Sequence, residues 1–281
     1  MIIDFHTHIF PEKIAEKALK ALSDSSRAVP YTDGTYAGRK NSMKESGIDY
    51  SVNLAVATKA NQVEGINNVA IETKEQEYNS GVIQFGAMHV EYENVKAELK
   101  RLSEAGVKGI KIHPAFYQLD ISDKRVKNII YEASSLGLII ITHAGWDIGF
   151  PEANYIPVDS LLDISKEINP DKMVLAHMGG WNDWEKVEKY LAGSSYYFDT
   201  AFSIGKINAR EDLPEPMRTY NMQDDDFVRL CRKHGIERIL FGTDSPWADQ
   251  REYVEKINSL DFTESEINCI FSDNAKKLLD L

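Results

Sequence analysis

The sequence predicts an α/β protein with a single domain, a (β/α)₈ TIM barrel over residues 1–281. Short apolar runs rich in β-branched residues alternate with amphipathic helical stretches. Runs that are apolar almost throughout suit a parallel sheet that is buried on both faces. A chain of 281 residues has room for a barrel of this class, which takes about 250 residues. The eight predicted strands are Ile2–His8, Ser51–Ala57, Val82–His89, Gly109–His113, Leu138–His143, Met173–His177, Tyr196–Ala201 and Arg238–Asp244.

Helices are predicted between these strands. In one of them, Val95, Leu99 and Leu102 recur at helical spacing and form an apolar stripe. An open, doubly wound sheet is the alternative, but the first strand is not followed by the phosphate-binding GxGxxG that such sheets use. The predicted helices include Asn94–Ala105, Lys124–Ser135, Asp159–Ile168, Trp184–Leu191 and Asp225–His234, and most end at a glycine suited to a C-cap (Gly106, Gly137, Gly193 or Gly235).

Two connections are long for a compact barrel. Residues 23–40 contain Arg27 and Arg39, and residues 202–222 are rich in proline and charge. Each is either a lid over the mouth of the barrel or a surface excursion, and the sequence leaves both interpretations open.

Charge, hydropathy and cysteine content indicate which partners and which compartment are expected. The net charge is −12 and no dense cluster of lysine or arginine occurs, so nucleic acid is not expected as a partner. The longest apolar run, Leu136–Ile141, is too short to span a membrane. Cys231 and Cys269 lack CxxC spacing and suit core packing in a reducing compartment. With no signal peptide visible, the expectation is a cytoplasmic protein that acts on a small molecule; whether it forms a homo-oligomer stays open.

The positions of the histidines are the strongest indication of function. A (β/α)₈ enzyme carries its chemistry at the C-terminal ends of the strands. One histidine, His234, falls in the last turn of a predicted helix, where a cation suits the helix dipole. The other six lie at or near predicted strand ends: His6, His8, His89, His113, His143 and His177.

A metal site explains this clustering. In a strand, residues two apart share a face, so Asp4, His6 and His8 are expected to point the same way. Neutral imidazole is a common ligand of divalent metals, and an acid that ends an apolar strand needs a cation as partner. The predicted ligands are His6, His8, His143 and Asp244, which would hold one divalent ion, zinc first, with manganese, cobalt or iron as alternatives.

One of these ligands, Asp244, and a further histidine, His177, are also expected to take part in the chemistry. Asp244 would accept a proton from a metal-activated water as general base. His177 would stand beside the metal and polarise a carbonyl group or stabilise an oxyanion.

Further residues are candidates for substrate binding. Lys111 shares a face with His113 and would contact a substrate carboxylate, bridge two metals after carbamylation, or extend to the rim of the barrel. For the others, the alternative is an ordinary structural residue. The substrate-binding candidates are Lys111, His113, Trp146, Trp247 and His89, with Trp181, Phe150 and Tyr117 as further pocket residues.

Four motifs resemble those of the amidohydrolase superfamily, in the amidohydrolase-related branch that includes aminocarboxymuconate semialdehyde decarboxylase. The resemblance extends from Ile2 to the C-terminal stretch 274–279. It implies a distorted (β/α)₈ barrel, a mononuclear metal on His6, His8, His143 and Asp244, and a catalytic His177. The motifs are Asp4-Phe-His-Thr-His8, Ile141-Thr-His-Ala-Gly145, Leu175-Ala-His-Met-Gly-Gly180 and Phe241-Gly-Thr-Asp-Ser-Pro246.

Three functions are compatible with these residues. The first is hydrolysis of an amide, ester or lactone by a metal-activated water. The second is non-oxidative decarboxylation, or hydration, of a small unsaturated or aromatic carboxylate at the same metal, which Lys111, Arg27, Arg39 or Arg210 at the mouth would favour. The third is a barrel that binds metal without catalysis, and the retention of both a base and an electrophilic histidine argues against it.

Overall fold

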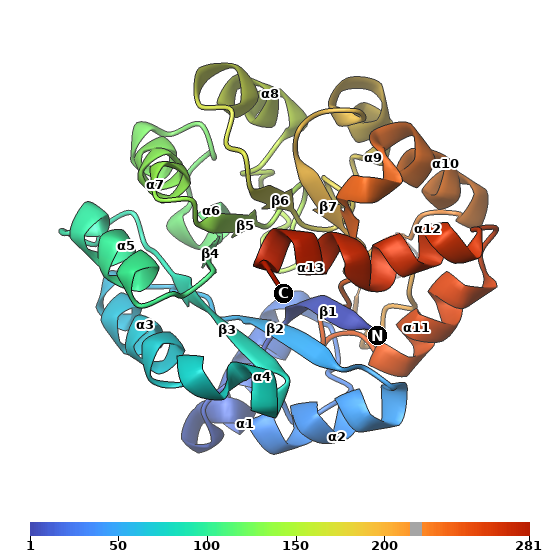
Figure 1. Cartoon of the computed structure of the whole chain (residues 1–281), viewed down its shortest axis with the longest axis horizontal. Coiled ribbons are helices and arrows are strands. Elements are labelled where there is room, and N and C mark those ends of the chain that lie inside the picture. The colour runs from blue at the N-terminus through green and yellow to red at the C-terminus, as the bar shows by residue number, and fades with distance from the viewer. Residues whose placement is uncertain (214–220) are drawn as a thin grey trace.

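The computed structural model describes residues 1–213 and 221–281. Its strands form one parallel sheet in the order β1 to β8, each paired with the next in sequence. Backbone hydrogen bonds between the first and last strand segments close the ring. Among them, Phe5 N–H donates to Phe241 O (2.7 Å) and Asp244 N–H donates to His6 O (2.8 Å). The predicted barrel is therefore confirmed (Figure 1). The strands are β1 (Ile3–Thr7), β2 (Tyr50–Leu54), β3 (Val82–Ala87), β4 (Gly109–Ile112), β5 (Ile139–Thr142), β6 (Met173–Leu175), β7 (Tyr197–Asp199) and β8 (Ile239–Leu240).

Helices surround this ring (Figure 1). The predicted helix Lys124–Ser135 is observed with the same bounds, and three of the other predicted helices agree with the structure within one residue at each end. The predicted helix Trp184–Leu191 is α-helical over Trp184–Lys186 and continues as a π-helical turn over Val187–Leu191. The helices are α1 (Glu12–Ser26), α2 (Tyr36–Ser46), α3 (Val63–Glu72), α4 (Glu77–Ser80), α5 (Val95–Glu104), α6 (Pro114–Tyr117), α7 (Lys124–Ser135), α8 (Val158–Glu167), α9 (Trp184–Lys186), α10 (Asp224–His234), α11 (Gln250–Ser259), α12 (Glu264–Asn268) and α13 (Asn274–Leu279).

The apolar core has two layers. An outer layer packs the helices against the barrel wall, and an inner layer fills the barrel from its N-terminal end with side chains such as Phe5, Phe85 and Ile141. Helix α13 adds Leu278 and Leu279 to the inner layer and crosses that end of the barrel (Figure 1). The N-terminal end is thereby sealed with apolar side chains, which leaves the opposite end for polar groups.

An irregularity in β1 changes the predicted direction of its side chains. The register against β2 shifts between Asp4 and Thr7. Phe5 packs in the inner layer, and His6 lies above it at the barrel mouth. Asp4 does not join the histidines as expected, because its carboxylate accepts hydrogen bonds from Thr243 and Gln250. A bulge of this kind breaks the two-residue alternation on which the prediction depended.

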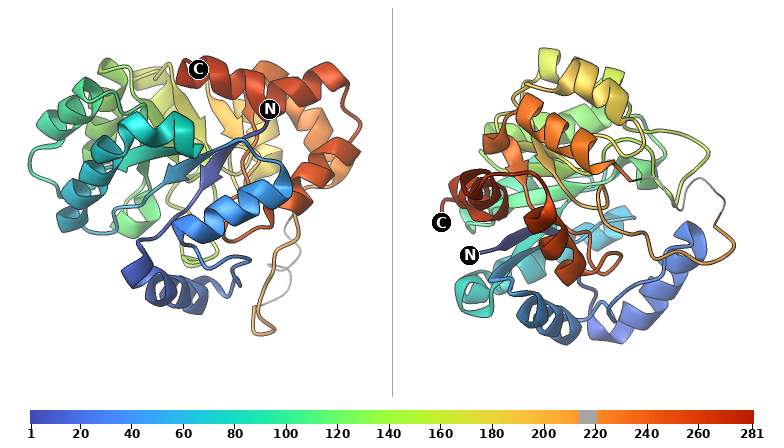
Figure 2. Two further views of the ribbon diagram at one scale, coloured as in Figure 1. Left: turned by 60° about the horizontal axis from the view of Figure 1, so that its bottom comes forward. Right: turned by 90° about the vertical axis from the view of Figure 1, so that its right-hand side faces the viewer.

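The two predicted lid segments lie together at the mouth. Residues 23–40 are not one long connection, because they contain the end of α1 and the start of α2. Ala28 forms an antiparallel bridge with Ala209, and both α1 and the connection after β7 lie at the end of the barrel opposite α13 (Figure 2). Residues 214–220 of the second segment lie outside the described residues.

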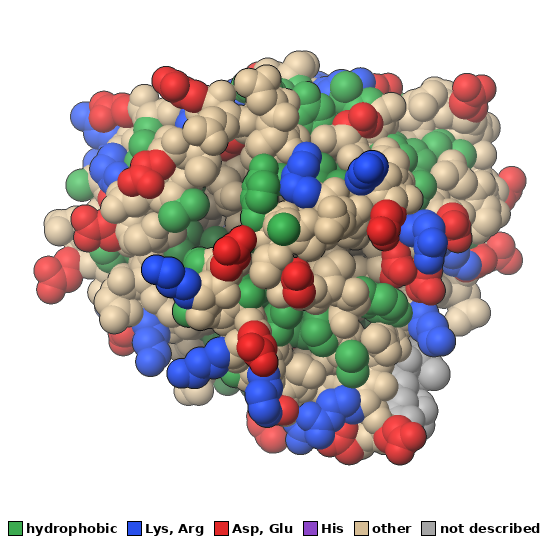
Figure 3. Space-filling view, turned by 90° about the horizontal axis from the view of Figure 1, so that it is seen from below, with side chains coloured by type: hydrophobic (Ala, Val, Ile, Leu, Met, Phe, Trp, Pro, Cys, Tyr) green, Lys and Arg blue, Asp and Glu red, His purple; other side chains and the backbone are tan. Residues whose placement is uncertain are grey.

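Charges of both signs cover the surface. On the face shown in Figure 3, acidic and basic side chains are interspersed rather than separated into patches. Within residues 1–213 and 221–281, no helix combines the length and apolar character that a membrane span requires.

His234 differs from its predicted role as a helix-terminal cation. The ring is 2% exposed and stacks on Phe198 at a centroid distance of 3.7 Å. Nε2 lies 2.9 Å from Tyr196 O, and Gly193 N–H donates to Nδ1. Burial is the main reason that the pKa of His234 falls to about 4, so the ring is neutral.

This burial makes the stability of the fold depend on pH. The folded pKa of about 4 lies below the unfolded value, so the unfolded state binds the extra proton first. The free energy of unfolding should therefore fall as the pH drops from about 6.5 towards 4, by about 3 kcal/mol from this residue. Denaturant titrations of His234→Gln and of the unmodified chain across this range would measure the difference, and equal slopes would contradict the assignment.

Candidate active site

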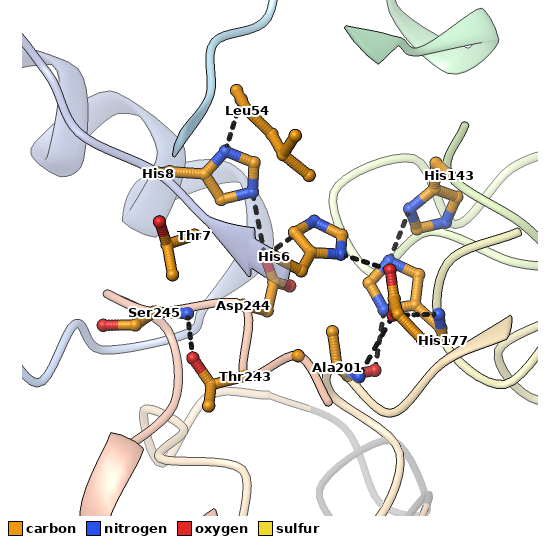
Figure 4. A network of polar contacts seen from close by, with 12 residues as sticks. His6, Thr7, His8, Leu54, His143, His177, Ala201, Thr243, Asp244 and Ser245 are labelled. Atoms are coloured by element: carbon orange, nitrogen blue, oxygen red, sulfur yellow. Dashed lines mark hydrogen bonds and ion pairs between the residues drawn. The ribbon is translucent and has the colours of Figure 1, made fainter. Parts of the chain in front are cut away.

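Three predicted ligands from opposite ends of the chain meet at the barrel mouth. His6 and His8 come from the end of β1, and Asp244 follows β8 (Figure 4). Oδ1 of Asp244 lies 2.9 Å from His8 Nε2 and 3.5 Å from His6 Nε2. Together the three side chains offer two nitrogens and a carboxylate oxygen in a group compact enough to hold a metal ion.

The contacts of His8 leave room for a positive charge in this group. Nδ1 lies 2.8 Å from the carbonyl oxygen of Leu54, which can only accept, so this nitrogen carries the proton of the neutral ring. The lone pair of Nε2 then faces the Asp244 carboxylate, another acceptor. Two acceptors at this distance are favourable only with a positive charge between them, and the donor set therefore fits a divalent metal.

Asp199 is a further residue of the cluster, which the sequence did not lead us to expect. This fully buried carboxylate follows an apolar run at the end of β7, and its Oδ2 lies 2.8 Å from His6 Nδ1. The contact fixes the proton on Nδ1 and leaves Nε2 for the metal group. The sequence contains a signal for this residue, because Asp199 ends an apolar run just as Asp244 does, and a buried acid needs a partner.

His143 and His177 form a second pair of nitrogens. His177 Nδ1 lies 2.9 Å from Ala201 O, and His143 Nε2 lies 2.8 Å from Trp146 O. Both contacts place the proton on that nitrogen, so the lone pairs of His177 Nε2 and His143 Nδ1 face one another across 3.0 Å. They need a shared proton or a metal between them. The structure thus places His143 against His177, whose ring centroid lies 5.3 Å from that of His6.

Lys111 lies inside the barrel rather than on its rim. The side chain is 1% exposed, and Nζ lies 3.4 Å from His6 Nε2. Burial lowers the pKa of Lys111 to about 8, against the opposing effect of Asp199, Asp244 and Asp147, so the ammonium group keeps its charge at neutral pH.

His113, which directly follows β4, extends the cluster beyond His143. Its ring stacks on His143 at 4.8 Å, and Nε2 lies 3.3 Å from the Asp147 carboxylate. Nδ1 of His113 is buried and has no hydrogen-bond partner within the described part of the chain. Asp147 was also not predicted, because it lies in the loop after β5 and not at the end of the strand.

The remaining candidates divide between two places. Trp146 and Trp247 pack against a cluster of Trp181, Phe202 and Ile207, and Phe202 in turn lies beside His177. His89 lies away from the metal group and packs edge-on against Tyr117 at 4.7 Å.

Electrostatics keep His6 and His177 neutral and Asp244 ionised. Burial, followed by neighbouring positive charge, lowers the pKa of His6 far below its ordinary value and that of His177 to about 3. Burial alone would raise the pKa of Asp244, but its interactions with the rings of His6 and His8 outweigh burial and hold this pKa well below its usual range. Neutral imidazoles and a carboxylate are the protonation states that bind a metal.

The backbone is also unusual at two of these positions. His177 and Asp244 have φ angles of 59° and 68°, in the left-handed region that most side chains avoid. Such conformations persist where the surrounding structure holds them, and they are concentrated at functional sites.

The chain matches a known protein family over nearly its whole length. Residues 3–281 match the model described as amidohydrolase. The chain belongs to the amidohydrolase family. The resemblance expected from the four motifs is therefore confirmed over nearly the whole chain.

Solved structures share the fold of this amidohydrolase at low sequence identity. A protein described as an amidohydrolase II has a TM-score of 0.72 and 19% identity, with 100% of both chains covered. The 5-carboxyvanillate decarboxylase of Novosphingobium aromaticivorans, complexed with manganese and 4-hydroxy-3-methoxy-5-nitrobenzoic acid, has a TM-score of 0.71 and 14% identity, covering 100% of this chain and 96% of its own. A 2,6-dihydroxybenzoate decarboxylase complexed with 2,6-dihydroxybenzoate has a TM-score of 0.70 and 15% identity, covering 100% and 99%. No curated protein matches the sequence.

Removal of the charge on Asp199 should weaken metal binding. In Asp199→Asn a neutral amide replaces the carboxylate that accepts from His6 Nδ1, so the proton of His6 is no longer held on Nδ1 by a negative charge. We expect metal affinity to fall about 10- to 100-fold. Competition with a chelator would measure this affinity. Asp261→Asn is the control, because the side chain of Asp261 is 97% exposed; equal affinities in both variants would refute the role of Asp199.

Proposed function

We propose that this amidohydrolase is a metal-dependent, non-oxidative decarboxylase of small aromatic or unsaturated carboxylates. The observation that carries the proposal is the position of Lys111, a buried ammonium group 3.4 Å from His6 Nε2. A substrate carboxylate beside the metal group would be held by this charge in a site shielded from water, where a charge-assisted hydrogen bond is strong.

The other three cations considered at the mouth are engaged elsewhere. Arg27 and Arg210 are about two-fifths exposed and pair with Asp212, and Arg210 also contacts Asp24. Arg39 is buried and donates to the backbone carbonyls of His8 and Ser245, so it supports the loops that carry the ligands. Lys111 is therefore the cation of this set that is available to a substrate.

The metal would be held by His6, His8 and Asp244, with His143 as the fourth ligand through the nitrogen that faces His177. When bound, a divalent ion would act as a Lewis acid that orients and polarises the substrate. Imidazole and carboxylate ligands suit zinc, manganese, cobalt and iron alike. The decarboxylase from Novosphingobium aromaticivorans is complexed with manganese, which supports manganese as a candidate metal in addition to zinc.

The residues around the metal group have the properties that decarboxylation requires. The C–C bond to the carboxyl group breaks, carbon dioxide leaves, and the electron pair stays on carbon and takes up a proton. Asp244, ionised at the mouth after β8, would accept this proton from solvent water and pass it to the carbon. His177, neutral and hydrogen-bonded to Ala201 O, would orient the substrate. The aromatic side chains of Trp146, Trp247 and Phe202 would provide an apolar wall for a ring.

Hydrolysis of an amide, ester or lactone is the second candidate. It is favoured by the Asp244 carboxylate, which stays ionised beside His8 and so could accept a proton from an attacking water. The two functions share the ligands and differ in the role of Lys111, which hydrolysis of a neutral substrate does not need.

The decisive experiment is a pair of substrate panels offered to metal-loaded protein. One panel contains aromatic carboxylates, including 2,6-dihydroxybenzoate and 5-carboxyvanillate, with release of carbon dioxide as the readout. The other contains amides, esters and lactones, with release of acid as the readout. Turnover confined to the first panel would support decarboxylation, and turnover confined to the second would replace it by hydrolysis.

Metal binding and turnover should separate in single variants. We expect His6→Ala to lose both metal and activity, because it removes a ligand. His177→Ala should keep about one equivalent of metal, measured by elemental analysis, while kcat falls about 10²- to 10⁴-fold. Loss of metal from His177→Ala would instead make His177 a ligand.

Lys111 should act on substrate binding. In Lys111→Met, which keeps the chain length and removes the charge, we expect KM for a carboxylate substrate to rise about 10- to 100-fold, since a hydrogen bond to a charged group contributes about 1.5–3 kcal/mol. Lys111→Arg is the matched control that keeps the charge. An unchanged KM in Lys111→Met, with a full metal complement, would contradict the proposed contact.

A further inference from the structure

The groups that would contact a substrate are almost completely buried. Lys111 and His6 are each 1% exposed, and His177 is 3% exposed. The side chains of His8 and Asp244 are 15% and 14% exposed, so little of the metal group faces solvent. A small organic molecule is much larger than water and must reach several of these groups at once. Part of the cover over the mouth must therefore move before such a molecule enters.

Two segments that are distant in sequence lie together over the mouth. The first is residues 25–31, which include the end of α1, and the second is residues 208–212 in the connection after β7. Ala28 and Ala209 join them in an antiparallel bridge at the end of the barrel opposite α13 (Figure 2). We call these two segments together the strap.

Backbone hydrogen bonds flank the bridge of the strap. Val29 N–H donates to Asn208 O (2.7 Å), and Arg210 N–H donates to Arg27 O (2.8 Å). These bonds lie outside the barrel sheet, and breaking them would leave the pairing of the eight strands intact. Segments held by few bonds at a surface are the ones that open most readily in a folded protein.

Ion pairs also link the two segments of the strap. Arg27 Nε lies 3.3 Å from the Asp212 carboxylate, and Arg210 Nη1 lies 3.2 Å from the Asp24 carboxylate at the end of α1. All four side chains are between 41% and 51% exposed. Exposed ion pairs contribute little to stability, so these contacts favour closure of the strap without locking it.

The first segment of the strap contacts two loops that carry site residues. Ser25 Oγ donates to Gly149 O (3.1 Å), in the loop that follows β5. Tyr31 N–H donates to Pro246 O (2.7 Å), two residues after the predicted ligand Asp244. Residues 25–31 therefore extend across the mouth from the loop after β5 to the loop after β8.

The second segment of the strap covers the apolar wall of the site. Ala209 packs against the cluster formed by Trp181, Phe202 and Ile207. The ring centroid of Phe202 lies 6.4 Å from that of His177. Movement of Ala209 away from this cluster would uncover the side of the site on which His177 lies.

We propose that the strap is a gate, and that separation of its two segments admits ligands to the site. Separation breaks the bridge between Ala28 and Ala209 and leaves the barrel closed beneath it. The gate goes beyond the proposed function, because it controls the entry of a metal or a substrate whichever reaction follows.

A disulfide across the bridge tests the gate. Ala28 and Ala209 form a non-hydrogen-bonded pair, and the Cα atoms of such pairs lie about 4.5 Å apart, within the range that disulfides span. In Ala28→Cys/Ala209→Cys we expect oxidation to slow the extraction of bound manganese by a chelator about 10-fold or more, because the covalent bond removes the open state. Reduction should restore the rate. Ala28→Cys and Ala209→Cys alone, oxidised in the same way, are the matched controls and should keep the rate of the unmodified chain.

Chemical modification of histidine gives a readout that needs no metal. Diethyl pyrocarbonate reacts with accessible neutral imidazoles, and peptide mass spectrometry assigns each modified residue. In the metal-free double variant, oxidation should slow the modification of His6 and His177. The modification of His89, which lies away from the metal group, should keep its rate and serves as the internal control.

Loosening the strap should have the opposite effect. Asp24→Asn/Asp212→Asn removes the carboxylates that pair across the strap, and we expect manganese extraction and histidine modification to become about 2- to 5-fold faster, as the loss of exposed ion pairs predicts. Asp163→Asn, which breaks an exposed ion pair on α8, is the control and should leave both rates unchanged.

The outcomes separate the gate from the proposed function. Unchanged rates in the double variant, with its disulfide verified by mass, would refute the gate. If the two thiols do not join, unchanged rates in Asp24→Asn/Asp212→Asn would refute it instead. Slower histidine modification in an oxidised protein that binds no metal would support the gate and overturn the proposed function alone.

Discussion

Closure of the barrel between β1 and β8 is the constraint on which the site depends. His8 and Asp244 are 236 residues apart in sequence, and their side chains meet only because the first and last strands are neighbours. The backbone bonds of Phe5 and His6 to the β8 segment set this register. Asp4 reinforces it by accepting from both the backbone and the hydroxyl group of Thr243.

Burial of charge is the second organising feature of the site. Asp199 is fully buried, Asp244 is largely buried, and the buried Lys111 lies beside His6. Buried charges are costly unless they are paired, and one ammonium group does not balance the carboxylates that surround it. The neutral histidines supply lone pairs rather than charge. A divalent cation would complete this arrangement, which is why the proposed metal explains the cluster better than any single hydrogen bond does.

The two ends of the barrel divide stability from chemistry. Helix α13 seals the N-terminal end with apolar side chains, and the inner core layer rises from there as far as Phe5 and Phe85. Above this layer the interior becomes polar at His6, Lys111 and Asp199. In β1 the change from apolar to polar side chains occurs between two adjacent residues. The register shift in this strand allows Phe5 to pack in the core and His6 to enter the site. The mouth is then bordered by α1 and the connection after β7, which are joined through Ala28 and Ala209.

The sequence by itself determined the eight strands, their order and the strand-end histidines, because apolar runs and their period report burial directly. It also identified the pairing of His6 and His8 with Asp244, since an acid that ends an apolar strand needs a partner. Only the tertiary structure decided the role of Asp199, the direction of Asp4 and the burial of His234. Each of these depends on a register shift or on a contact between distant segments, and local periodicity carries no information about either. The tertiary structure likewise decided which cation enters the site, because ion pairs with Asp24 and Asp212 hold Arg27 and Arg210 outside it.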